Sequence, residues 1–184
     1  VTVRGDTKGS DHDLDLDPSV DEIDENPGSI ALLVTLGDFE FYTAGDQTDN
    51  DWRSEPAVEE SVIEANAITG GNDIDVLKVS HHGSDTSTSP SSVASLDPEV
   101  AIISTKYTRG DQLPKLVTLM QLEANQCYTL ITGDGKNPVT EKFTGSRNTD
   151  LDDMYTPSVD AVFNDQGHVT VLVSLNGDRY TVLG

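Results

Sequence analysis

Three apolar segments alternate with two amphipathic ones between residues 74 and 132, and this alternation limits the possible folds more than any other feature of the sequence. Residues 74–79, 100–104 and 127–132 are short and mostly apolar, as in buried strands. Residues 90–96 and 113–124 lie between them and have the apolar spacing of helices. Strands that alternate with helices in this way predict an α/β layer.

A hairpin is expected before this layer. Residues 30–34 and 39–43 are rich in β-branched and aromatic side chains, and the pair Gly37-Asp38 between them suits a hairpin turn. We therefore expect these two strands to pair antiparallel. A further short strand is predicted at residues 1–3.

A helix and a second hairpin complete the pattern. The helix is predicted at residues 55–67, with Ser54 as its N-cap. Its apolar side chains fall on one face: Val58, Val62 and Ile63. Residues 168–175 and 179–183 are joined by an Asn-Gly turn, which is a strong short-range hairpin signal between alternating apolar segments.

The sequence is strongly acidic, with 33 Asp and Glu, 11 Lys and Arg, and a formal net charge of -22. Such a chain has no basic surface that would capture nucleic-acid phosphates by charge. Much of the acid lies in two segments poor in apolar residues, at about residues 11–25 and 133–160. We interpret them as solvated inserts in one domain or part-domain that spans residues 1–184.

The acidity has two interpretations. Adaptation to salt is one, and a role in holding calcium through carboxylates is the other, although neither insert has the spacing of an EF-hand loop. The salt interpretation favours an extracellular or extracytoplasmic protein, a secreted one for example, or alternatively one from the cytoplasm of a halophile.

Membrane insertion and disulfide formation are not expected in this chain. Its longest apolar stretches, such as residues 30–34, are far shorter than the roughly 20 residues that a spanning helix needs. Cys127 is the single cysteine, so an intrachain disulfide cannot form. Because it lies in an apolar segment, we expect a buried small side chain and not a nucleophile.

Polar side chains that suit a metal follow two of the predicted strands. Asp46 comes directly after a Gly at the end of residues 39–43, where a carboxylate can point into a cleft, although Gly-Asp also forms plain turns. His81 and His82 precede Gly83 at the end of the next strand, and neutral imidazoles suit a metal ligand or a general base. The alternative is a histidine pair at a solvated turn.

The order of these motifs resembles the metallo-β-lactamase-fold hydrolases, and within them the hydrolase domain of ComEC-type DNA-uptake (competence) proteins. The resemblance covers residues 26–132 and the closing strands. Its motifs, in order, are Ala44-Gly45-Asp46, Asp75-Val76-Leu77-Lys78-Val79-Ser80-His81-His82-Gly83-Ser84, Ser87-Thr88-Ser89-Pro90 and Val100-Ala101-Ile102-Ile103-Ser104. The resemblance implies the C-terminal half of an αββα sandwich, with a mixed sheet flanked by helices.

The resemblance also implies a site. Asp46 would bind or bridge a metal pair, and His81 or His82 would be the late histidine ligand of the same catalytic centre. Ser84 and Ser87 would stabilise the turn or touch a substrate phosphate. The implied cofactor is zinc in a two-metal site, with manganese as an alternative, and the implied reaction is hydrolysis by a metal-held hydroxide.

The sequence departs from this family in its first ligand motif. The motif His-x-His-x-Asp-His is absent, and the only early histidine, His12, has neither its spacing nor a buried strand before it. Where relatives have His-Pro after the strand at residues 100–104, this chain has Thr108-Arg109-Gly110. One aspartate and one histidine are too few for a zinc site, which uses three or four protein ligands.

Three explanations fit this departure. The N-terminal half of the same fold lies elsewhere in a precursor or in a second chain, the chain is a degenerate metal-free descendant, or the match is local and the fold differs. The first predicts a metal-dependent hydrolase of a phosphodiester, nuclease-like and incomplete in this chain. The rival prediction is a non-catalytic acidic structural or binding module, calcium-binding and part of an extracellular assembly.

Overall fold

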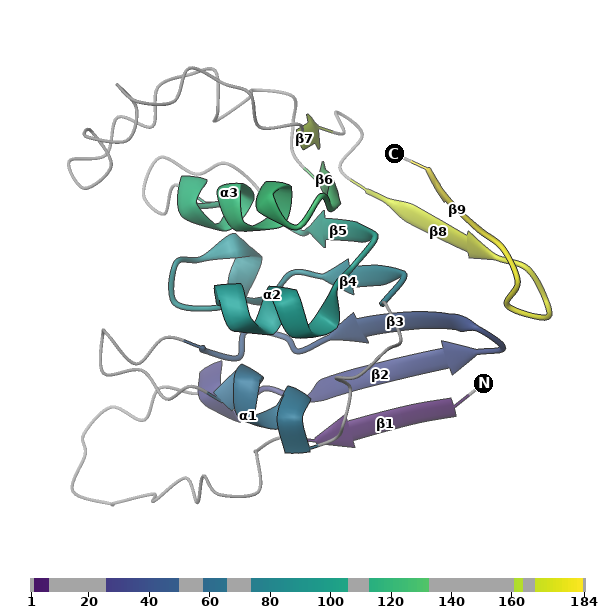
Figure 1. Ribbon diagram of the computed structural model, residues 1–184, viewed down its shortest axis with the longest axis horizontal. Coiled ribbons are helices and arrows are strands. Elements are labelled where there is room, and N and C mark those ends of the chain that lie inside the picture. Colours follow the sequence, from purple (N-terminus) through teal and green to yellow (C-terminus); the bar gives the residue numbers. More distant parts are fainter. Residues whose placement is uncertain are drawn as a thin grey trace.

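The computed structural model describes residues 2–6, 26–49, 58–65, 74–105, 113–132, 161–163 and 168–183. These residues form an α/β fold in which one mixed sheet carries helices on one face and a hairpin on the other (Figure 1). The predicted inserts at residues 11–25 and 133–160, and the residues His12 and Thr108, lie outside the described residues.

The sheet has its strands in chain order, from β1 to β7. Their bounds are β1 Thr2–Asp6, β2 Ala31–Leu36, β3 Phe39–Thr43, β4 Val76–Lys78, β5 Val100–Ile103, β6 Tyr128–Ile131 and β7 Ala161–Phe163. The first three strands pair antiparallel, and each later strand pairs parallel to the one before it. The predicted hairpin is confirmed, since β2 and β3 pair across the turn with Leu36 opposite Phe39.

Three helices cover one face of the sheet, namely α1 Val58–Ala65, α2 Pro90–Leu96 and α3 Leu116–Ala124. Helix α2 has the predicted bounds because the side chain of Ser89 accepts a hydrogen bond from the backbone N–H of Ser92, and Pro90 occupies the first turn. Helix α3 begins at Leu116, later than the predicted residue 113, because Lys115 is still extended. The predicted N-cap of α1, Ser54, lies outside the described residues.

The two faces of the sheet have separate cores. Strand side chains alternate between faces, so Leu77 and Ile103 pack under the helices while Val76 and Ile102 face the other way. The second face is covered by the hairpin of β8 Thr170–Val173 and β9 Tyr180–Leu183, which pair antiparallel as the Asn-Gly turn predicts. None of the helices in the described part of the chain is long and apolar enough to cross a membrane.

The hairpin approaches the sheet most closely at its own turn. A Cβ added to Gly177 would lie 1.6 Å from the carbonyl oxygen of Leu36, and one added to Gly37 would lie 1.9 Å from the carbonyl oxygen of Asn176. Both glycines have positive φ, and the two turns therefore touch backbone to backbone. The rings of Phe39 and Tyr180 add a contact between centroids 5.4 Å apart.

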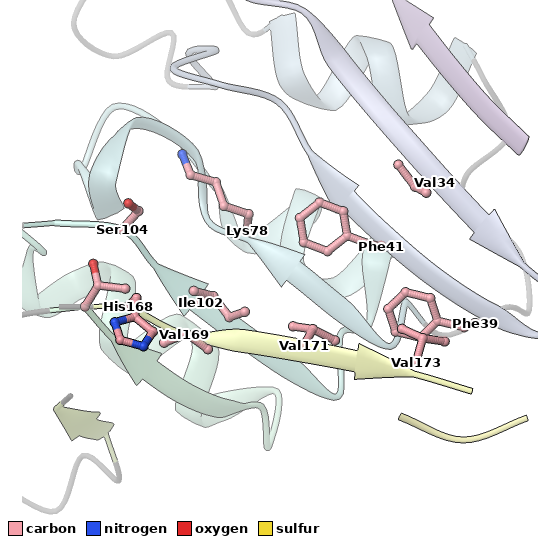
Figure 2. A pocket seen from close by; sticks show the side chains of 11 residues that line it. Val34, Phe39, Phe41, Lys78, Ile102, Ser104, His168, Val169, Val171 and Val173 are labelled. Atoms are coloured by element: carbon pink, nitrogen blue, oxygen red, sulfur yellow. The ribbon is translucent and has the colours of Figure 1, made fainter. Parts of the chain in front are cut away.

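Beyond this contact the hairpin does not fill the face that it covers. A groove of about 600 Å³ runs between β8 and the sheet (Figure 2). Apolar side chains of both walls line it, among them Phe41, Ile102 and Val171, and Lys78 and Ser104 lie at its polar end. The sheet thus has one face sealed by helices and one face that keeps an open apolar groove.

Candidate metal-ligand site at the ends of β3 and β4

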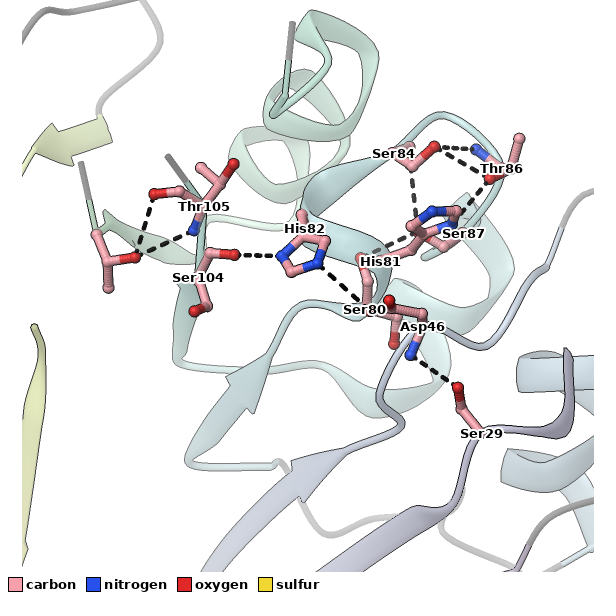
Figure 3. Close-up of polar contacts among 11 residues, drawn as sticks. Ser29, Asp46, Ser80, His81, His82, Ser84, Thr86, Ser87, Ser104 and Thr105 are labelled. Carbon is pink, nitrogen blue, oxygen red and sulfur yellow. Dashed lines mark hydrogen bonds and ion pairs between the residues drawn. The ribbon is translucent and has the colours of Figure 1, made fainter. Parts of the chain in front are cut away.

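Asp46 and His82 come together at one edge of the sheet. Because β3 and β4 are parallel neighbours, the residues that follow them leave the sheet at the same edge. The Nε2 atom of His82 lies 3.8 Å from Oδ1 of Asp46 (Figure 3). Both side chains reach solvent, with exposed fractions of 45% for His82 and 36% for Asp46.

A backbone carbonyl fixes the His82 ring. Its Nδ1 atom lies 2.5 Å from the carbonyl oxygen of Ser104, at the end of β5. A carbonyl oxygen only accepts hydrogen bonds, so Nδ1 carries a proton, and in the neutral ring Nε2 is the nitrogen with the lone pair and faces Asp46. Metal-binding histidines are usually held in this way, with the second ring nitrogen donating to a carbonyl or carboxylate.

The gap between the two side chains suits a cation. At 3.8 Å the Nε2 and Oδ1 atoms are too far apart for a direct hydrogen bond. A zinc ion that bonds each at about 2.0–2.2 Å would fit between them. Among the residues that the structure describes, however, no group of three or more His, Cys, Asp or Glu side chains gathers around a common point. The two side chains present are of the kind that binds a transition metal, but two ligands are too few to hold one.

The turn that carries the histidines has an unusual backbone. His81 and His82 have φ angles of 45° and 55°, in the left-handed region that residues other than glycine rarely enter. The strand has ended at Lys78, so the strand alternation that would separate the two rings no longer applies. The His81 ring turns away from Asp46, and its Nδ1 atom lies 3.3 Å from Oγ1 of Thr86. Of the two predicted histidines, the structure brings only His82 to Asp46.

The Asp46 loop is anchored on two sides. Gly45 has a φ of +60°, and a Cβ there would lie 2.9 Å from Cβ of Ser29, so a larger residue would push the loop away. The backbone N–H of Asp46 donates to Oγ of Ser29 at 3.2 Å. The N–H of His81 donates to the carbonyl oxygen of Gly45 at 3.0 Å, which ties the aspartate loop to the histidine turn.

The two predicted serines are used inside the loop. Ser84 and Ser87 are buried. The Ser87 hydroxyl donates to the carbonyl oxygens of Ser80 and Ser84, and the Ser84 hydroxyl pairs with that of Thr86. These contacts fit the turn-stabilising alternative, and a contact of either serine with a substrate phosphate stays a prediction.

Three neighbours of the site were not assigned to it from the sequence. Ser104 supplies the carbonyl for His82, and it follows β5 at the edge where β3 and β4 also end, so sheet order would have indicated it. Lys78 is partly buried, which lowers its pKa, while the carboxylate of Asp46 acts in the opposite direction. Glu59 lies three and four residues before the buried Val62 and Ile63, so helical periodicity would have placed it on the inner face of α1.

Comparisons with known proteins leave the family open. A search of protein-family models and a search of curated proteins each gave no match to this chain. The fold and the site therefore define the class as an α/β protein with an Asp-His pair at the carboxyl ends of its central strands.

Proposed function

We propose that the chain supplies one half of a metal-dependent hydrolase of the metallo-β-lactamase kind, with Asp46 and His82 as its share of the metal ligands. The ordered motifs of the sequence support this family, and so do helices on one face of a mixed sheet. On this interpretation the sheet is the C-terminal layer of an αββα sandwich, and zinc, or alternatively manganese, is the cofactor.

The observation that carries the proposal is the orientation of the His82 ring. Its Nδ1 proton is held by the Ser104 carbonyl, and its Nε2 atom faces Oδ1 of Asp46 across 3.8 Å. The left-handed backbone of both His81 and His82 adds to this observation. Strain of this kind, at about 1–3 kcal/mol for each residue, gathers at functional sites.

A metal at this position would polarise the bond to be hydrolysed and would lower the pKa of a water molecule. The chain's own residues would hold and orient that ion: Asp46 with a carboxylate oxygen, and His82 with Nε2. Because the surface is strongly acidic, a phosphodiester substrate would be attracted by the metal site and not by a basic face. We propose a phosphodiester, as in a nuclease, on the resemblance alone.

The open face of the sheet is where we place the complementary half. Two ligands are too few for zinc, and the groove of about 600 Å³ begins beside Lys78, the residue at the end of β4. Its apolar lining, with Phe41 and Ile102 on the sheet side, would be covered by a second sheet that brings the remaining ligands. That second sheet would come from the same precursor or from another chain.

The first test measures zinc binding by calorimetry on the full-length protein, in which the complementary half supplies the remaining ligands. We expect His82→Gln and Asp46→Asn each to weaken zinc binding by tenfold or more, because each removes a ligand. The matched controls are His81→Gln, which removes the neighbouring ring, and Asp38→Asn, which removes an exposed carboxylate on the β2–β3 turn. Both controls are expected to bind zinc like the unchanged chain. A larger loss from His81→Gln than from His82→Gln would contradict the assignment.

The second test measures catalysis with the complementary half present. Single-stranded DNA and a small phosphodiester are offered to the full-length protein with zinc or manganese, beside its Asp46→Ala variant. We expect the variant to lose nearly all hydrolysis. Equal activity in the two proteins would show that Asp46 is no part of the catalytic centre. Calcium binding without zinc binding would favour the acidic binding module instead.

A further inference from the structure

A buried acid lies directly beneath the histidine turn. Glu59, on the inner face of α1, is fully buried. Its Oε1 atom accepts a hydrogen bond from the hydroxyl of Ser80 at 2.6 Å, and its Oε2 atom accepts one from the backbone N–H of Thr88 at 2.8 Å. One carboxyl group therefore joins helix α1 to two points of the loop at the end of β4.

These two points bracket the segment that carries the site. Ser80 directly precedes His81 and His82, and Thr88 lies at the far end of the same loop. Thr88 is itself left-handed, with a φ of 53°. Left-handed residues other than glycine persist only where their surroundings hold them. Glu59 contacts this loop at one left-handed residue and immediately before two others.

We infer that Glu59 is a positioning residue, which holds Ser80 and Thr88 so that the His82 ring keeps its Nδ1 proton on the Ser104 carbonyl and its Nε2 lone pair toward Asp46. Glu59 does not touch the site itself, since its contacts are with the loop on the buried side. Its effect on metal affinity rests on the proposed function, whereas its effect on the His82 ring does not.

Two substitutions of Glu59 should differ in their effect, because only one of them can keep its hydrogen bonds. Burial, and secondarily the charge of Asp49, raises the pKa of Glu59 to about 8, which favours the neutral acid. In that form the carboxyl proton on Oε1 donates to the Ser80 hydroxyl, while Oε2 still accepts from the N–H of Thr88. A glutamine is close to that neutral acid in shape: its amide oxygen would accept from the N–H of Thr88, and its NH2 group would donate to the Ser80 hydroxyl. A leucine fills similar space but makes neither bond. Glu59→Gln should therefore preserve the position of the loop, and Glu59→Leu should not.

The test records nitrogen NMR spectra of the His82 ring in the metal-free protein at pH 7. We expect a ring protonated on Nδ1 in the unchanged chain and in Glu59→Gln. In Glu59→Leu the proton should shift toward Nε2, because the ring is no longer aligned with the Ser104 carbonyl. Glu64→Leu, an exposed position on the same helix, is the control and should leave the spectrum unchanged.

Ser80→Ala gives the same test with a smaller disturbance of the core, because it removes one of the two bonds and leaves the acid in place. It should shift the His82 proton in the same direction as Glu59→Leu, and this measurement decides the matter if the leucine variant does not fold. An unchanged His82 tautomer in folded Glu59→Leu or in Ser80→Ala would overturn the inference and leave Glu59 a purely structural residue.

Zinc titration of the same variants, with the complementary half present, separates the two proposals. Loss of a group that orients a metal ligand commonly costs 10- to 100-fold in affinity, which is the loss that we expect for Glu59→Leu and not for Glu59→Gln. If no variant, nor the unchanged chain, binds zinc while the tautomer still follows Glu59, the proposed function fails and the positioning role stands. If zinc binds but the His82 tautomer is the same in all variants, the positioning role fails and the proposed function stands.

Discussion

The two faces of the sheet differ in how completely they are covered. On the helical face, Ile103 has an exposed fraction of 0% and packs among fully buried side chains of the helices. On the hairpin face, Ile102, the preceding residue of the same strand, has 9% and borders the groove. The hairpin residues packed there, such as Val171 and Tyr180, are only partly buried. The helical face is therefore a completely buried core, whereas the hairpin covers the other face only in part.

The largest expected effect is a loss in the free energy of unfolding, which should differ between the two faces when the same substitution, isoleucine to alanine, is made on each. We expect Ile103→Ala to lower the free energy of unfolding by about 4 kcal/mol and Ile102→Ala by about 2 kcal/mol. Side chains cannot collapse into a hole on the tightly packed helical face, whereas Ile102 already borders open space. Urea denaturation measures both. Equal losses would mean that the hairpin face is as well packed as the helical one.

The second largest effect is expected in the pH dependence of stability, because the buried acid Glu59 lies on the helical face. The pKa of Glu59 rises from an ordinary 4.5 to about 8 on folding. Between these values the unfolded chain releases a proton that the folded chain keeps, so stability falls as pH rises. Relative to Glu59→Gln, the unchanged chain should lose about 3 kcal/mol between pH 5 and pH 8. Parallel pH profiles of the two proteins would contradict this.

A substitution in the β8–β9 turn should detach the hairpin from the sheet. Gly177→Ala places a methyl group 1.6 Å from the carbonyl oxygen of Leu36, at a φ of +81°. We expect a loss of about 2 kcal/mol, confined to the hairpin. Hydrogen exchange should therefore accelerate in β8 and β9 while the amides of β4 and β5 stay protected. Gly28→Ala is the control, because a Cβ there meets nothing within 4 Å.

The smallest effect is expected at the rim of the hairpin face. The hydroxyl of Tyr180 donates to Oε2 of Glu99 at 2.5 Å, near solvent. Tyr180→Phe removes this bond but keeps the ring against Phe39, so stability should fall by about 1 kcal/mol. Thermal denaturation would detect it. A loss as large as that of Ile103→Ala would show that this bond, and not apolar packing, holds the hairpin in place.

Turn and capping residues in the sequence were enough to predict the elements whose ends they determine. Strand β3, helix α2 with its Ser89 cap and the closing hairpin were predicted from turn residues and capping residues. Strand β4 is shorter than the predicted residues 74–79, because its pairing with β3 covers only Val76–Lys78. Its length depends on its neighbours, and a single sequence does not contain that information.

The residue types of the site could be predicted from the sequence, but the orientation of their side chains could not. Asp46 and a histidine were expected at neighbouring strand ends, and the structure places Asp46 beside His82. The choice between the two histidines depends on the left-handed turn and on the Ser104 carbonyl, which come from the fold. Glu59 could have been found from helical periodicity, since an acid on an apolar face needs a buried partner.

The contact between the two turns, at Gly37 and Gly177, also has a consequence during protein synthesis. Domains generally fold as units, and residues 168–183 are made after the strands whose face they cover. The face of the sheet with Phe39 and Phe41 therefore stays uncovered until residues 168–183 have been made. In this interval the nascent chain presents an apolar surface, and chaperones would be expected to bind it there.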